Sequence, residues 1–239
     1  MSTLNYYYLS YLPSIDRLGQ PVEIDCSELL QLLTSGGVLT RAGKICRAII
    51  LSGDLMLRES IIAGQIDEAA PSTLTQKQVS GEEPLPEYIV GQDNRDKSGA
   101  LLTDTVWAGY FTFAAQTASG TRSRFLQNWV RYEVSLRNAI AAKRAEILGL
   151  EASDYIVASE LGGLDMSSEV SRWSEAKSKN PLEEQKALDL ARWEWLEQNG
   201  RYFSFSDDEI ASYSARLAVS GRWAKLELGN RKAKAGLEL

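Results

Sequence analysis

The chain has 239 residues, 44% of them hydrophobic, and a formal net charge of −6, because 32 acidic residues outnumber 26 basic ones. This length is sufficient to bury the core of one large domain or two smaller ones. The acidic balance disfavours general affinity for nucleic acid. The complete absence of histidine excludes His-based catalytic triads and most zinc or iron sites.

The two cysteines, Cys26 and Cys46, are isolated and lack the spacing of metal ligands. Both occupy apolar helical positions, so we expect buried thiols in a reducing cytoplasm. The first residues do not have the pattern of a secretory peptide, and no segment approaches the roughly 20 apolar residues of a membrane span. The sequence predicts a cytoplasmic protein that associates with a membrane only through its partners.

Along the first lobe, the aromatic residues 4–12 predict either a short strand or a first helix, and the patterning leaves room for one short N-terminal strand pair. Asp25 and Glu28 form a capping box for a leucine-rich helix, which we expect to end at Gly36-Gly37. The next helix begins near Thr40.

Ser52-Gly53-Asp54 is expected to interrupt that helix and cap another one. From Gly64 to about Asp104 the chain is rich in proline and polar residues, which predicts a long connection with one helical turn near Leu85–Val90. This connection divides the chain into an N-terminal helical lobe, residues 1–104, and a C-terminal helical lobe, residues 105–239.

The second lobe is more regular. Apolar spacings of three and four predict a helix over Thr105–Ala118 and a long one over Thr121–Leu148, which Gly149 ends in the left-handed conformation. A shorter helix is expected near Ala152–Leu161, followed by a loop at Gly162-Gly163.

Two capped helices complete the C-terminal lobe. Asn180-Pro181 begins a helix that runs to Gly200, and Ser206 with Glu209 begins a last helix that we expect to end near Gly229. The sequence therefore predicts an all-α, multi-helix, bundle-like protein of about eight helices with at most one or two strands.

The acidic clusters do not form a recognisable catalytic pair. Asp207-Asp208-Glu209 and Glu183-Glu184 each fall in the first turn of a predicted helix, where carboxylates offset the partial positive charge of the free amides. Neither a phosphate-binding loop nor a dinucleotide fingerprint is present. The sequence predicts no catalytic residue, no cofactor and no metal.

The predicted helix Thr121–Leu148 carries a local excess of positive charge. A basic helix of this kind is typical of a solvated surface, of a protein-docking surface or, less often, of a nucleic-acid site. Arg131, Arg137 and Arg144 are candidate partner-contacting residues. The basic side chains of the segment are Arg122, Arg124, Arg131, Arg137, Lys143 and Arg144.

Trp193 and Trp195 lie about 200° apart around a helix and cannot face the same way. One of them is expected to be exposed or covered by another lobe, and Trp193 is the candidate anchor for a partner.

Several segments together resemble one known family. The run Phe125–Leu150 is similar to the helix "N-x-W-x-x-x-E-x-x-L-R-N-x-x-x-A-x-x-x-x-x-LGL" of the C-subunit-like proteins of bacterial V/A-type ATPases. Residues 5–9, 85–88, 188–196 and 202–205 agree in the same order. The matching positions of the helix are Asn128, Trp129, Glu133, Leu136, Arg137, Asn138, Ala142 and Leu148-Gly149-Leu150.

The resemblance implies a protein similar to the C-type component of these vacuolar/archaeal-type enzymes, known as the d subunit in eukaryotic complexes, in its bacterial short form. Such proteins are helical funnels that sit on the membrane rotor ring, receive the foot of the central stalk and carry no catalytic residues. The expected partners are the central-stalk subunits and the proteolipid ring, at the cytoplasmic side of the inner membrane, in proton or sodium transport.

Two other classes of function remain open from the residues themselves. A helical adaptor or assembly factor acting through protein–protein interaction would share the same patterning. A carboxylate-dependent hydrolase would instead require two acidic side chains that converge in a cleft.

Overall fold

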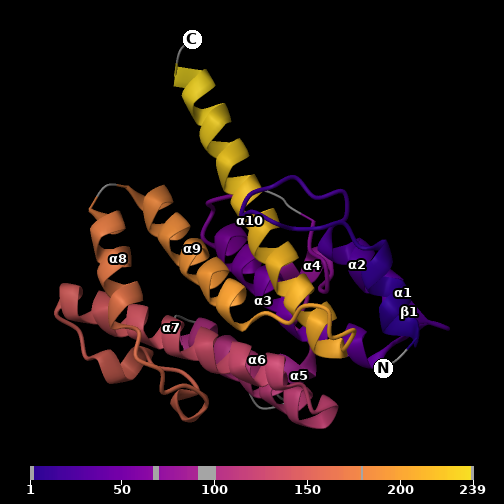
Figure 1. The fold of residues 1–239 in the computed structure, drawn as a ribbon. Helices are drawn as coiled ribbons and strands as arrows, with labels where there is room; N and C mark the ends of the chain where they lie inside the picture. Colours follow the sequence, from indigo (N-terminus) through magenta and orange to yellow (C-terminus); the bar gives the residue numbers. More distant parts are fainter. Residues whose placement is uncertain (1–2, 67–69, 91–100, 179, 238–239) are drawn as a thin grey trace.

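The computed structural model describes residues 3–66, 70–90, 101–178 and 180–237. These residues form an all-α fold with ten α-helices, two 3₁₀ turns and one two-stranded antiparallel pair (Figure 1). The α-helices are α1 (Thr3–Tyr11), α2 (Cys26–Leu32), α3 (Arg41–Ile62), α4 (Gln76–Ser80), α5 (Glu87–Val90), α6 (Leu101–Thr121), α7 (Arg124–Leu148), α8 (Ser167–Lys177), α9 (Pro181–Asn199) and α10 (Asp207–Leu237).

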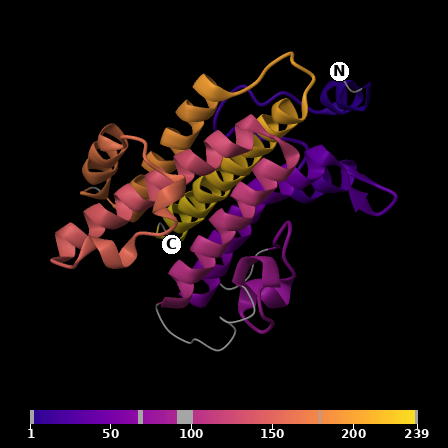
Figure 2. The ribbon, with the colours of Figure 1, turned by 90° about the horizontal axis from the view of Figure 1, so that it is seen from below.

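The core is built by the long helices. Helix α10 packs along α3, α9 and α7, and α6 packs against both α3 and α7 (Figures 1 and 2). Apolar residues at spacings of three and four give α3 a buried face that includes Ile45, Ile49 and Leu55, all at most 1% exposed. Helices α8 and α9 form an antiparallel pair beside α7, and the C-terminal end of α10 projects beyond the rest of the molecule (Figure 1).

The predicted lobe boundary at residue 104 falls inside α6, and the connection that precedes it is partly structured. The predicted helical turn is α5, within the expected range Leu85–Val90, while residues 91–100 lie outside the described part of the chain. Gly109 of α6 lets the backbone of Ile89 approach so closely that a Cβ at this position would meet its carbonyl oxygen. Buried residues from both predicted lobes form one hydrophobic cluster.

The N-terminal segment is a helix, which resolves the alternative between strand and helix for residues 4–12. We expected Gly36-Gly37 to end the leucine-rich helix, but α2 already ends at Leu32. The two glycines instead form the turn of a short hairpin between β1 (Thr34–Ser35) and β2 (Val38–Leu39). Both glycines have positive φ, +57° and +79°, as a two-residue type I′ hairpin turn requires. This hairpin is the strand pair of the described fold.

The prediction that Ser52-Gly53-Asp54 interrupts a helix is wrong, because these residues lie inside α3, which is one continuous helix of 22 residues. Asp54 is 4% exposed, and its carboxylate accepts hydrogen bonds from the backbone amides of Ser72, Thr73 and Leu74. A residue that looks like a local helix cap instead fixes a loop about 20 residues away.

Most predicted caps in the second lobe are present. Gly149 ends α7 with φ +68°, and Asn180 caps α9 by accepting from the Glu183 amide at 2.9 Å. The expected helix at 152–161 consists of two 3₁₀ turns, Ala152–Tyr155 and Ser159–Leu161. Helix α8 was not expected from the sequence, and α10 passes through Gly229 as far as Leu237.

Candidate functional site

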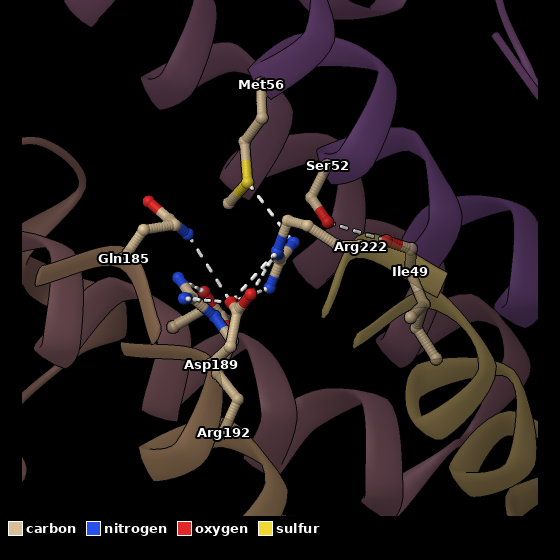
Figure 3. Close-up of polar contacts among 8 residues, drawn as sticks. Ile49, Ser52, Met56, Gln185, Asp189, Arg192 and Arg222 are labelled. Carbon is tan, nitrogen blue, oxygen red and sulfur yellow. Dashed lines mark hydrogen bonds and ion pairs between the residues drawn. The ribbon is translucent and has the colours of Figure 1, made fainter. Parts of the chain in front are cut away.

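A network of buried charges joins four of the long helices. Its centre is Asp189 of α9, which is completely inaccessible to solvent. Arg222 of α10 donates from Nε to Oδ1 and Oδ2 of Asp189 at 2.9 and 3.0 Å (Figure 3). Arg192 and Gln185 lie three and four residues from Asp189 along α9, and a nitrogen of each lies 3.5 Å from Oδ1 of Asp189. Arg222 also reaches Sδ of Met56 on α3, at 3.4 Å.

The network continues to α7 through a bidentate ion pair. Arg192 donates from Nε and Nη2 to the two oxygens of Glu133, at 2.7 and 3.0 Å, and both residues are less than 10% exposed. Burial by itself lowers the pKa of Arg192, but the charge and the hydrogen bonds of Glu133 outweigh burial and raise that pKa above the usual range. The arginine therefore stays charged, which makes the pair a fixed link between α7 and α9.

An aromatic layer lies next to these charges, between α7 and α9. The ring of Trp195 lies 5.3 Å from that of Trp129 and 5.1 Å from that of Tyr132. Phe125 packs against both tryptophans from the beginning of α7. Large aromatic surfaces and a bidentate ion pair thus hold the same two helices together.

The structure separates the three predicted partner-contacting arginines. Arg137 lies 4.5 Å from the ring of Trp107 and pairs with Asp104 at 3.4 Å, so it holds α7 against α6, and burial lowers its pKa. Arg144 pairs with Glu184 on α9 at 2.5 Å. Arg131 is exposed and lines an open hollow, where its Nε donates to the carbonyl oxygen of Gly162 at 3.3 Å.

The prediction that Trp193 anchors a partner does not fit its position. The side chain is only 4% exposed, its indole Nε1 donates to Glu197 at 2.9 Å, and the guanidinium of Arg216 lies over the ring at 5.3 Å. The packing of α9 against α10 covers this face of the helix. Trp195, two residues further along α9, faces a different direction. It is partly exposed and lines a surface pocket.

A groove of about 790 Å³ runs along the beginning of α7, between the end of α6 and the 3₁₀ turn at Ser159–Leu161. Its wall includes Arg122, Arg124 and Arg131, with Glu160 as the one acidic residue among the described residues that line it. A second pocket, of about 260 Å³, shares Arg124 and Asn128 with it and adds Trp195 and Arg201. We refer to these two neighbouring hollows, with Arg122, Arg124, Arg131, Arg201 and Trp195 on their walls, as the arginine groove.

One residue of this groove, Arg131, was predicted from the sequence as a partner-contacting residue, whereas Arg122 and Arg124 were predicted only as members of a basic helix. The alternation of Trp193 and Trp195 was the available signal for an exposed tryptophan, but it does not tell which of the two is exposed. Arg201 lies in the loop between α9 and α10, and no sequence pattern indicates that this loop lies near α7.

The acidic cluster at the beginning of α10 has three separate structural roles. Asp207 accepts from Nδ2 of Asn5 at 2.9 Å, and Asp208 accepts from Oγ of Ser123, the cap of α7, at 2.5 Å. Glu209 accepts from the amides of Phe203, Ser204 and Phe205 at 2.6–2.8 Å. Within the described ranges, no three acidic or cysteine side chains are placed to hold a metal ion.

None of the described helices combines the length and the apolar character needed to cross a bilayer.

The comparisons with known proteins identify the family of the chain. Residues 68–234 match a family model described as a protein of unknown function, DUF2764. Neither the search of curated proteins nor the search of solved structures found a match. Since the family model covers more than half of the chain, including α7, α9 and the arginine groove, the protein belongs to the DUF2764 family.

Proposed function

We propose that this protein is a non-catalytic subunit of a rotary V/A-type ATPase that couples the central stalk to the proteolipid ring during proton or sodium transport. It would lie at the cytoplasmic face of the inner membrane and be held there by its partners in the complex. The proposal builds on the resemblance to the C-subunit-like proteins, and the packing of the resembling segments supports it.

The observation that carries the proposal is that two segments of the resemblance, far apart in sequence, pack on one another. Trp129 and Glu133 belong to the resembling helix, and Arg192 and Trp195 belong to the segment 188–196. In the fold, Glu133 pairs with Arg192 and Trp129 lies against Trp195. Positions that carry the resemblance therefore meet in the fold although about 60 residues separate them, as expected if they belong to one conserved structural unit.

Three further resembling positions also lie at contacts between elements. Tyr6, from the segment 5–9, contacts Phe205, from the segment 202–205, with ring centroids 5.2 Å apart. Asn138 of the resembling helix exchanges two hydrogen bonds with the backbone of Val157, at 2.8 and 3.0 Å. These similar positions therefore lie at contacts between elements.

The physical design also suits a part that transmits torque. A coupling protein must resist sliding of its helices when force passes through it. The charges around Asp189 connect α3, α7, α9 and α10, and moving α7, α9 or α10 would leave a buried charge without its partner. The cost of such a displacement opposes shear between the helices.

The test is purification of the native complex under gentle conditions, using a tagged copy of the chain in its source cell. We expect the stalk and ring subunits to co-purify in fixed proportion, with an equally tagged, unrelated soluble protein as the control. Recovery without these subunits would overturn the proposal. Association only with incomplete ATPase complexes would instead favour an assembly factor.

A functional measurement separates coupling from catalysis. Deleting the gene should leave ATP hydrolysis by the soluble catalytic head intact, while ATP-driven ion uptake into inverted membrane vesicles should be lost. A plasmid copy of the gene should restore uptake. Normal ion transport without the protein would contradict a coupling role.

A further inference from the structure

The arginine groove gathers several arginines whose charges are, for the most part, not used by the fold. The guanidinium groups of Arg122, Arg124 and Arg201 form no hydrogen bond or ion pair with any residue that the structure describes, and all three side chains are exposed. By contrast, Arg192 and Arg222 are neutralised by buried carboxylates. Together with Arg131, four arginines thus line the two hollows, and Glu160 is the one acidic residue of their described lining.

Arg122 occupies a strained backbone position at which glycine would cost less. Arg122 lies at the corner between α6 and α7 with φ +53°, in the left-handed region. Its amide donates to the carbonyl of Ser119 at 3.1 Å, and the Ser123 amide donates to that of Ala118 at 2.9 Å, as in a helix end that normally has glycine at this position. A side chain here costs about 1 kcal/mol, so strain at a surface arginine points to a use for its side chain.

The groove also has an apolar component. Trp195 lies on its wall and is supported from behind by Trp129 and Tyr132, so the exposed part of its ring is held in place. Leu161 lines the larger of the two hollows. Arginine and tryptophan are among the residue types that most often dominate the energetics of protein–protein interfaces.

We propose that the arginine groove binds an acidic segment of a partner protein, with carboxylates paired to Arg122, Arg124 and Arg131 and an apolar side chain on Trp195. This inference deepens the proposed function, on which it rests for the identity of the partner: the segment would belong to a protein of the stalk or the ring. The binding chemistry itself depends only on the groove.

A nucleic acid fits the same observations less well. The whole chain carries a net charge of −6, so its long-range field repels a polyanion, and Glu160 lies within the groove itself. The first amides of α7, which attract phosphate at many helix starts, are already used: Ser123 Oγ accepts from Leu126, and Asp208 accepts from Phe125. Short acidic segments with an apolar residue match both the charges and the tryptophan.

The experiment is a titration of the full-length protein followed by the arginine Nε–Hε signals in NMR spectra. The probe is a peptide of about 16 residues with glutamate pairs on both sides of one leucine, and an oligothymidylate of about the same length is the nucleic-acid comparison. We expect the signals of Arg122, Arg124 and Arg131 to shift with the peptide, while that of Arg17 stays unchanged. Raising the salt concentration should weaken binding because the contacts are exposed.

Charge reversal provides the matched variants. The triple change Arg122→Glu, Arg124→Glu and Arg131→Glu should weaken peptide binding at least tenfold. The control, Arg17→Glu with Lys44→Glu and Lys225→Glu, alters net charge equally at exposed positions outside the groove and should bind within twofold of the unchanged protein. If the reversed variant is poorly folded by circular dichroism, the corresponding glutamine variant replaces it, with at least a fivefold weakening expected.

Each result decides the proposal. Absence of peptide binding, equal weakening in both variants, or tighter binding of the oligothymidylate than of the peptide would overturn it. In the native purification, unchanged recovery of ATPase subunits with the groove-reversed variant would also overturn it while leaving the proposed function intact. Peptide binding at the groove, together with a purification that contains no ATPase subunits, would support the groove and reject the proposed function.

Discussion

Two groups of arginines around α7 have opposite relations to the fold. Arg192 and Arg222 lie between helices, and each donates to a carboxylate that is buried. Arg122 and Arg124 lie on an open side, at the beginning of α7, and contact no charged partner among the described residues. The fold depends on the first group, and the second group is available for binding.

The difference follows from desolvation. A buried charge is costly unless hydrogen bonds and an opposite charge compensate for the loss of water, so removing one partner leaves the full penalty on the other. An exposed charge keeps its water, and its contribution to stability is close to zero. Four measurements test this contrast, from the largest expected effect to the smallest.

Arg192→Met removes the partner of a buried carboxylate. Glu133 would lose both of its charged hydrogen bonds, and Asp189 would lose one donor. We expect a loss of about 3–5 kcal/mol in the free energy of unfolding, measured by urea denaturation. The matched surface variant Arg124→Met should change stability by less than about 0.5 kcal/mol. Similar values for the two variants would remove the distinction between the two groups.

Asp54→Asn tests a buried carboxylate whose partners are backbone amides and not arginines. Asparagine keeps one acceptor oxygen, so only part of the hydrogen bonding to Ser72, Thr73 and Leu74 can remain. We expect a loss of about 2–3 kcal/mol and faster amide hydrogen exchange at Leu74. Unchanged exchange would show that this loop is held by other contacts.

Arg122→Gly should have opposite effects on stability and on binding. Glycine accepts the left-handed conformation without strain, so the free energy of unfolding should stay constant or rise by up to about 1 kcal/mol. The same change removes a groove charge, so the affinity for the acidic peptide should fall several-fold. A clear loss of stability would mean that the Arg122 side chain serves the fold.

The two thiols give the smallest effect at neutral pH. Burial raises the pKa of both Cys26 and Cys46 to about 12 from the ordinary value of 9.0. The folded protein therefore keeps these protons when the unfolded chain releases them, so the thiols lower stability as the pH rises from about 9 towards 12 and have no effect well below that range. At a pH of about 8, where the unfolded thiol begins to ionise, a thiol reagent should react with Cys46 only after urea unfolding. Rapid reaction of Cys46 in the folded state would contradict its burial.

Local patterns predicted the parts of the fold that local physics controls. The helix class, the Asn180 cap and the left-handed Gly149 were all predicted, because each depends on residues within one or two turns of the chain. Helix α8 was missed because its cap residue, Met166, makes no side-chain capping hydrogen bond. Asp54 was misread because its partners lie about 20 residues away, beyond any local pattern.

The candidate site shows the same limit. The sequence marked α7 as basic and indicated that Trp193 and Trp195 must face different directions, since charge content and helical geometry are local properties. Only the packing of α9 against α7 and α10 decided that Trp193 is buried and Trp195 lines the groove. Tertiary structure likewise decided which arginines are neutralised. An ion pair between two helices depends on the distance between the arginine and the carboxylate, and this distance is set by how the helices pack and not by the sequence of each helix.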